Sequence, residues 1–169
     1  MRLFTKYCAV FVISLGSITA CTPDEPEVTY ASTYPVSGEW WVTYQVESAP
    51  GVYEDVGHGY SKLLTFNTSA DDGDSVWVSD EENFWEFKIK AAVDMETYEF
   101  STEESANAFY DSKVIVQNGK VLLKEGRSTS GVVTDSIYFE VSFDDDTPAY
   151  GTTYIVSGVR RTGFLEDEH

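Results

Sequence analysis

Cysteine and positive charge are scarce in this chain, and each scarcity excludes a class of protein. The two cysteines among 169 residues, Cys8 and Cys21, both lie near the beginning, so a domain formed by the later residues has no disulfide and depends on core burial. The 11 Lys and Arg stand against 29 Asp and Glu, which gives a formal net charge of −18. Because such a field repels nucleic acid and anionic membrane surfaces, we expect no nucleic-acid partner.

Histidine is also scarce, which argues against the common hydrolase sites. The two histidines are His58, between two glycines in an expected loop, and His169 at the C-terminus. A serine hydrolase usually pairs its nucleophile with a histidine base and often carries a Gly-x-Ser-x-Gly turn, a motif that does not occur here. We therefore interpret His58 as an exposed turn residue and expect neither a catalytic residue nor a bound cofactor.

Long apolar runs are confined to the first 20 residues. Arg2 and Lys6 flank the start of an apolar stretch that is too short to span a membrane, which predicts a secretion signal over 1–20. The segment Ile18-Thr19-Ala20-Cys21 resembles the bacterial lipobox, and this implies that Cys21 becomes the acylated first residue of the mature chain. We therefore expect palmitate or similar acyl chains on Cys21, which would hold the protein at a membrane.

The segment after the lipobox has the composition of a tether. Prolines stand among acids and small residues over 21–35, which is typical of an extended linker, and one domain is expected over 36–169. This layout predicts an outer-membrane lipoprotein of the cell envelope. Asp24-Glu25 resembles the acid-rich export signal of surface-exposed lipoproteins of the Bacteroidetes, with an ordinary acidic linker as the alternative.

Alternation of apolar and polar residues dominates the chain after Gly38. Apolar positions over 85–91 alternate with charged ones, a period of two that fits a strand and no helix. The same alternation is present over 40–46 and 137–143. Further strands are expected at 60–67, 74–79, 97–101, 113–117, 120–125 and 152–162. About nine short strands without alternating helices predict an all-β antiparallel sandwich or barrel.

The sequence predicts the conformation of two connecting segments. Asn118-Gly119 lies between two expected strands and predicts a type I′ hairpin turn, which needs positive φ at both central residues. The residues over 101–110 are expected to form one short turn or loop.

A glycine, a tryptophan and an arginine at the two ends of the β region carry a family resemblance. Gly38-Glu39-Trp40 begins the first expected strand, and Arg160-Arg161 ends the last. These residues resemble the calycin signature, in which the tryptophan closes one end of a barrel and the arginine packs across it. The resemblance implies an antiparallel calycin- or lipocalin-like barrel of about eight strands. Strand parity lets only one of Arg160 and Arg161 meet Trp40, and an arginine that instead pairs with a ligand carboxylate is the alternative.

Over roughly residues 35–169 the chain resembles the Bacteroidetes family of small lipoproteins called lipid-binding putative hydrolases. Four stretches carry this resemblance: Ser37 to Tyr44, Leu64 to Thr68, Trp85 to Lys88, and Thr153 to Phe164. The family implies a lipid or other apolar small molecule as ligand, whereas a hydrolase activity follows only from its name. A barrel of about eight strands either fills with side chains or holds one small ligand. The candidate lining residues are Tyr44, Phe66, Trp85, Phe87, Tyr98, Phe139 and Val141.

Three other patterns have functional alternatives. Glu81, Glu82, Glu103 and Glu104 could supply a glycosidase pair but fit solvated loops better. The acidic runs 71–74 and 144–146 fail the EF-hand template, so we expect no metal site. Trp41 and Trp77 stand opposite to the apolar faces of their strands, which raises the alternative of a glycan-binding or complex-forming surface module. The ligand and any protein partner stay open.

Overall fold

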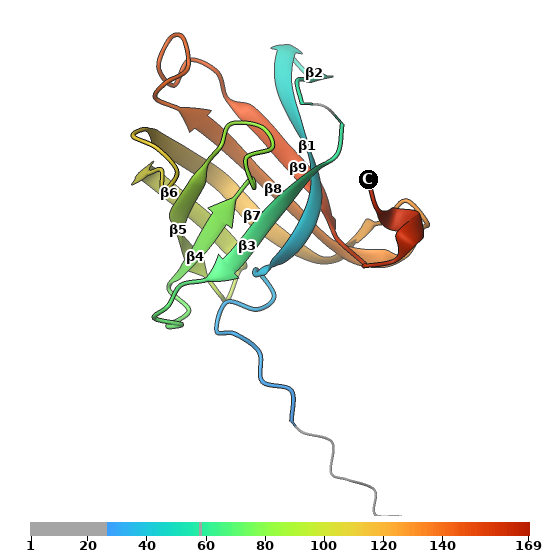
Figure 1. Cartoon of the computed structure of the whole chain (residues 1–169). Helices are drawn as coiled ribbons and strands as arrows, with labels where there is room; N and C mark the ends of the chain where they lie inside the picture. Colours follow the sequence, from blue (N-terminus) through green and yellow to red (C-terminus); the bar gives the residue numbers. More distant parts are fainter. Residues whose placement is uncertain (1–26, 58) are drawn as a thin grey trace, which may run out of the picture.

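The computed structural model describes residues 27–57 and 59–169, and the chain forms nine strands and one short 3₁₀ helix over that part (Figure 1). The expected signal peptide, Cys21 and His58 lie outside the described residues. The strands are β1 Gly38–Ala49, β2 Val52–Asp55, β3 Ser61–Asn67, β4 Ser75–Ser79, β5 Lys88–Asp94, β6 Glu99–Ala106, β7 Lys113–Arg127, β8 Val133–Phe143 and β9 Tyr154–Arg160. The helix η2 spans Leu165–Asp167.

Eight of the strands close into an antiparallel barrel, which confirms the predicted fold class. Each strand from β3 to β9 pairs with the next along the chain, and β1 pairs with both β3 and β9. The closing register runs from Trp40 opposite Arg160 to Gln45 opposite Ile155. The remaining strand, β2, pairs only with the far end of β1 as a hairpin that projects from the barrel (Figure 1). Over the described ranges no helix is long and apolar enough to cross a membrane.

The barrel interior is a continuous apolar core, because alternate residues of each strand face inward. Trp40, Val42 and Tyr44 of β1 are fully buried, as is Phe139 of β8, and all belong to one cluster. Phe84, Trp85 and Tyr98 pack against that cluster while remaining partly exposed. The interior is therefore lined largely by aromatic and branched side chains.

The predicted hairpin at Asn118-Gly119 is wrong, because β7 runs through it as one strand from Lys113 to Arg127. Asn118 does adopt positive φ, at 53°, but the register against β6 and β8 shifts there as in a β-bulge. A side chain at Gly119 would collide with the backbone oxygen of Phe100 on β6. The Asn-Gly pair thus serves a close strand approach instead of a chain reversal, which local sequence does not distinguish.

Two further boundaries differ from the sequence-based expectation. Strand β6 continues to Ala106, so most of the loop expected over 101–110 is strand. Strand β5 begins at Lys88, so Trp85 precedes it in a loop. Both differences arise because pairing with the neighbouring strands decides the strand limits: β5 pairs with β4 and β6, and β6 pairs with β5 and β7.

Different segments of the chain close the two ends of the barrel. At one end, which we call the sealed end, β1 starts and β9 ends, and the N-terminal residues described leave the barrel from here (Figure 1). At the other end, which we call the mouth, β4 and β5 are joined by residues 80–87, which we call the lid loop. The mouth and its lid loop form the candidate functional site.

Candidate functional site

The lid loop is organised by one buried carboxylate. Asp80 at the end of β4 has no exposed surface. Its Oδ1 accepts the backbone N–H groups of Glu82 at 3.0 Å and Phe87 at 2.9 Å. Its Oδ2 accepts those of Phe84 at 3.1 Å and Trp85 at 2.8 Å. One side chain therefore holds four backbone amides and shapes the loop as a unit.

Two rings of the lid loop turn toward the barrel and cover the mouth. Phe84 stacks on Tyr44 with ring centroids 4.1 Å apart, and its edge meets Tyr154 at 5.2 Å. Trp85 stacks on Phe143 at 4.7 Å with the two rings nearly parallel. The covered surface is thus an aromatic wall made by β1, β8 and β9. An apolar ligand can use the same wall when the rings move away.

The outer side of the lid loop is tied to neighbouring loops by polar contacts. Trp85 Nε1 donates to Asp145 at 3.0 Å, and the same carboxylate accepts the hydroxyl of Tyr110 at 2.7 Å. Asn107 Nδ2 donates to the Glu86 carbonyl oxygen at 3.0 Å. The bonds to Asp145 lie at exposed positions, so water can replace them at little cost when the loop moves.

The lid loop has an unfavourable backbone at three positions. Glu81, Glu82 and Glu86 have φ of 53°, 60° and 51°, the left-handed region that suits glycine. A non-glycine residue there costs of order 1–3 kcal/mol unless its surroundings impose the conformation. Asp80 supplies that constraint for Glu82 and Glu86, since its four bonds span 82–87, whereas the N–H of Glu81 donates to Ser79 Oγ at 3.3 Å. The closed lid is therefore held by contacts and is not favoured by its own sequence.

A buried hydroxyl without a partner lies beneath the lid loop. Tyr44 is fully buried, and among the residues described no group hydrogen-bonds to its Oη. Burial raises the pKa of Tyr44 well above its ordinary value, and the negative charge of Asp80 raises it further. The hydroxyl is thus a protonated donor at neutral pH. Trp41 Nε1 and Thr68 Oγ1 are also buried without a partner among the residues described, but Tyr44 Oη is the one beneath the lid loop, where a ligand oxygen can meet it.

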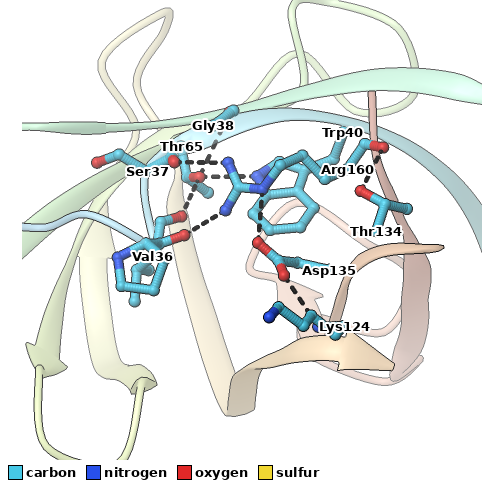
Figure 2. A network of polar contacts seen from close by, with 10 residues as sticks. Val36, Ser37, Gly38, Trp40, Thr65, Lys124, Thr134, Asp135 and Arg160 are labelled. Atoms are coloured by element: carbon cyan, nitrogen blue, oxygen red, sulfur yellow. Dashed lines mark hydrogen bonds and ion pairs between the residues drawn. The ribbon is translucent and has the colours of Figure 1, made fainter. Parts of the chain in front are cut away.

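The sealed end is closed by Trp40 and Arg160, whose guanidinium carbon lies 4.3 Å from the indole centroid (Figure 2). Trp40 Nε1 donates to Thr65 Oγ1 at 2.8 Å, and that hydroxyl donates to the Val36 carbonyl oxygen at 2.6 Å. A side chain at Gly38 would collide with the guanidinium of Arg160, which explains the glycine two residues before the tryptophan.

The guanidinium of Arg160 has its donors engaged at this end (Figure 2). Nε donates to Asp135 Oδ2 at 2.9 Å, Nη1 to the Ser37 carbonyl oxygen at 2.8 Å, and Nη2 to the Pro35 carbonyl oxygen. Arg161 points to the outside, where it pairs with Glu39 and Glu168. The structure therefore brings Arg160 and not Arg161 to Trp40.

The structure brings together most of the predicted lining residues, but at different depths. Tyr44 and Trp85 meet at the mouth through the ring of Phe84. Phe87, Phe139 and Val141 are buried in the core. Tyr98 follows the β5–β6 turn toward the sealed end and is partly exposed.

The expectation that Phe66 lines the interior is wrong. On β3 the inward residues are Leu63 and Thr65, and Phe66 lies on the outer face, opposite Trp77 of β4 and beneath the ammonium of Lys88. Two adjacent leucines leave the phase of the alternation ambiguous. The polar Thr65 is accepted inside because its hydroxyl links the Trp40 indole to the backbone.

The outward tryptophans differ in accessibility. Trp41 is only 5% exposed, because the ring of His169 meets it at 5.4 Å and Lys62 lies above it. Trp77 is partly exposed beside Phe66, with ring centroids 6.5 Å apart. Only Trp77 therefore presents an aromatic surface to solvent.

The acidic runs act in turns. Asp71 Oδ1 accepts the backbone N–H and the hydroxyl of Ser32, and Asp144 Oδ1 accepts the backbone N–H of Lys113. Within 27–57 and 59–169, no group of three or more His, Cys, Asp or Glu side chains is arranged to hold a metal ion.

Sequence reasoning missed three residues of the mouth: Asp80, Phe84 and Tyr154. Asp80 ends a strand and is followed by Glu-Glu-Asn, a context in which aspartate caps turns. Phe84 sits next to Trp85 and has the opposite strand parity, so the expected strand hid it. A prediction of a loop over 80–87 would have identified Phe84 and Trp85 as an aromatic pair.

Surface depressions occur away from the lid loop. One of about 580 Å³ lies between β5, β6 and β7 and has a mixed lining that includes Val93, Phe100 and the charged side chains of Asp94 and Glu99. Another, near β8 and β9, lies by Tyr60 and Ser157 on the outer face. Neither offers the apolar enclosure that a lipid chain requires, which leaves the wall beneath the lid loop as the better candidate.

Comparison with known proteins gives one family. The model of the family described as lipid-binding putative hydrolase matches residues 25–165, which covers the whole barrel. A search of curated proteins finds no match.

Proposed function

Because the chain belongs to the lipid-binding putative hydrolase family, we propose that it binds one lipid or other apolar small molecule inside the mouth of its barrel. The family and the β-barrel fold both support lipid binding. The location rests on one observation: the rings of Phe84 and Trp85 in the lid loop pack on an aromatic wall formed by Tyr44, Phe143 and Tyr154.

Ligand entry requires the lid loop to move. When Phe84 and Trp85 leave the wall, a hydrocarbon chain can take their place and restore the buried apolar area, which is worth about 25 cal/mol per Å². The exchange is nearly balanced because one apolar surface replaces another. The left-handed glutamates favour it, since they regain ordinary backbone when the loop is released.

We further propose that the protein acts as a lipoprotein of the cell envelope, anchored through acylated Cys21. Support comes from the lipobox-like segment 18–21 and the tether composition that follows it. The described part of the tether leaves the barrel at the sealed end (Figure 1), which is opposite to the mouth. A lipid binder of this design could take up ligand without its anchor blocking the entrance.

A surface that binds glycans is the second candidate, favoured by one observation. Trp77 and Phe66 form a partly exposed aromatic pair on the outer face, and aromatic faces can stack on sugar rings. Lys88 lies over both rings, at 5.3 Å from Phe66 and 5.5 Å from Trp77, and so occupies the face that a sugar would need.

A matched pair of tryptophan variants separates the two functions. Full-length protein is titrated with pyrene-labelled dodecane, and Trp85→Ala is compared with Trp77→Ala. Removal of the competing Trp85 ring is expected to raise affinity by roughly five- to tenfold, equivalent to about 1 kcal/mol. Trp77→Ala is expected to bind as the wild type does. Absence of saturable binding, or loss of binding only in Trp77→Ala, would overturn the interior site.

The anchor is tested separately by Cys21→Ala. Acyl chains contribute about 0.8 kcal/mol per buried methylene, so loss of the acylated residue should move the protein from the detergent phase to the aqueous phase. Partitioning of Cys21→Ala equal to that of the wild type would show that the anchor assignment is wrong. Cys8→Ala is the control and should partition as the wild type.

A further inference from the structure

The unpaired hydroxyl of Tyr44 and the charge around the mouth indicate which lipids the barrel takes. The inference rests on the proposed binding site and names its ligand class. Tyr44 lies inside the barrel, its ring stacked on Phe84 of the lid loop at 4.1 Å. Movement of the lid loop therefore uncovers Tyr44 together with the apolar wall.

The Tyr44 hydroxyl has been left without a partner although polar groups occur nearby. The neighbouring mouth tyrosines are paired: Tyr110 Oη donates to Asp145 at 2.7 Å, and Tyr154 Oη donates to Asp146 at 3.4 Å. Asp80 uses both its oxygens for backbone amides of the lid loop. In the closed protein Tyr44 has thus no bond to lose, and a ligand oxygen would supply its first.

The charges around the mouth are negative. The lid loop itself carries three exposed glutamates, the buried Asp80 lies at its base, and Asp145 and Asp146 border it from the β8–β9 loop. The nearest lysine on β5, Lys88, is directed over the outer aromatic pair instead. Two further lysines near this end are also engaged: Lys113 pairs with Glu104 at 2.8 Å, and Lys62 lies over Trp41. A carboxylate or phosphate entering here would therefore meet mainly like charge.

The arginine that could receive an acidic headgroup is at the wrong end. Arg160 lies beneath Trp40 at the sealed end and donates to Asp135 and two backbone carbonyl oxygens. If Arg160 bonded to a ligand carboxylate instead, Asp135 would lose its ion pair with Arg160. The arrangement therefore gives no site for an anionic lipid.

We propose that the barrel selects single-chain lipids with an uncharged polar end, such as fatty alcohols or monoacylglycerols, and that Tyr44 Oη donates a hydrogen bond to the ligand oxygen. The chain lies on the wall of Phe143 and Tyr154, and the oxygen meets Tyr44. Free fatty acids and lysophospholipids are rejected by charge, although their chains fit equally well.

Three ligands of equal chain length test this selection on the full-length protein: dodecanol, dodecanoate and dodecane. The hydroxyl of dodecanol should give about tenfold tighter binding than dodecane, which corresponds to one added hydrogen bond. Dodecanoate should bind weaker than dodecane at neutral pH. Tighter binding of dodecanoate than of dodecanol would overturn the proposal.

Tyr44→Phe keeps the ring and its stacking on Phe84 and removes only the hydroxyl. It should reduce dodecanol affinity to the level of dodecane, leave dodecane unchanged, and leave the melting temperature of the free protein unchanged or raised. Tyr138→Phe, which removes a hydroxyl that donates to Glu140 on the outer face of β8, is the control and should retain the preference for dodecanol. Equal binding of all three ligands by wild type and Tyr44→Phe would refute the selection and leave lipid binding intact. Failure of all three to bind would refute both, and the ligand series in the wild type decides the question even if a variant does not fold.

Discussion

The sealed end and the mouth are both closed by aromatic side chains, yet different interactions hold them. At the sealed end Trp40 is fixed by a hydrogen bond to Thr65 and by Arg160, which itself bonds to Asp135 and the backbone. At the mouth Phe84 and Trp85 rest on other rings, and the polar group beneath them, Tyr44 Oη, is unpaired. At the sealed end Trp40, Thr65 and Arg160 have hydrogen-bond partners within the protein, whereas at the mouth Tyr44 Oη is left for a ligand.

This difference shows how a closed barrel can be stable and still bind. Directional bonds at one end hold the strands in register, since β1 and β9 meet there at Trp40 and Arg160. Stacked rings at the other end can be exchanged for a chain of similar polarity. Opening the sealed end would break an ion pair and several bonds, so ligand exchange should occur at the mouth.

The largest expected effect is loss of stability when the sealed end is broken. Trp40→Ala removes a fully buried indole together with its bond to Thr65 and its contact with Arg160. Chemical denaturation should show a destabilisation of ~3–5 kcal/mol. Trp85→Ala removes an equal side chain at the mouth, where the ring is partly exposed, and should cost clearly less. Equal losses would contradict the distinction between the ends.

Replacing Arg160 or Arg161 should destabilise the fold less than Trp40→Ala does, and the two replacements should differ from each other. Arg160→Met leaves Asp135 and two carbonyl oxygens without their donor, and because the ion pair is only about four-fifths buried we expect a loss of about 2–3 kcal/mol. Arg161→Met removes ion pairs to Glu39 and Glu168 that are more exposed than the Arg160–Asp135 pair, and it should cost about 0–1 kcal/mol. Urea unfolding of the two variants measures this contrast. The same loss in both would show that Arg160 does not close the barrel.

Loosening the lid loop should affect its dynamics more than global stability. Asp80→Asn turns one acceptor oxygen into a donor that faces two backbone amides, which costs about 1–3 kcal/mol locally. Hydrogen exchange over 81–87 should become faster. Asp94→Asn is the control, since Asp94 accepts the backbone N–H groups of Glu96 and Thr97 in a turn near the sealed end. Unchanged exchange of the lid loop in Asp80→Asn would contradict its role.

The smallest expected effect is a pH-dependent contribution of Asp167, beside the sealed end, to the stability of the fold. Burial alone would raise the pKa of Asp167, but hydrogen bonds from Thr162 and Ser130 lower it from 3.8 to about 2. A folded pKa below the unfolded value stabilises the fold above pH 4, and this contribution is lost as the pH falls toward 2. The Tm difference between wild type and Asp167→Asn should therefore be largest near neutral pH and shrink toward pH 2. Glu166→Gln, at the exposed neighbouring position, is the matched substitution for comparison at each pH.

The parts of the fold that depend on repeated local signals were predictable. Alternation over 40–46 and 137–143 indicated the inward faces of β1 and β8, and all apolar residues of those faces except Val46 are buried. The calycin-like pairing of Trp40 with an arginine at the end of the last strand located both termini of the barrel sheet. Strand parity also indicated that only one of Arg160 and Arg161 can meet Trp40, and the structure shows that it is Arg160.

The remaining features depend on partners distant in sequence. Thr65 faces inward because Trp40 and Val36 bond to its hydroxyl, which reverses the face of Phe66. Asn118-Gly119 continues a strand because Phe100 approaches it closely. Asp80 is buried because four amides of the lid loop converge on it. None of these contacts has a periodic signal, so the mouth could not be derived from alternation.

Photochemical labelling tests most directly whether an apolar ligand occupies the mouth. A dodecanol analogue with a diazirine on its chain is bound to the full-length protein and irradiated, and the labelled residues are identified by mass spectrometry. Our account predicts adducts on the wall beneath the lid loop, at Phe143 and Tyr154, with competition by unlabelled dodecanol. Adducts confined to the outer pair Phe66 and Trp77, or to residues beside Arg160 at the sealed end, would contradict it.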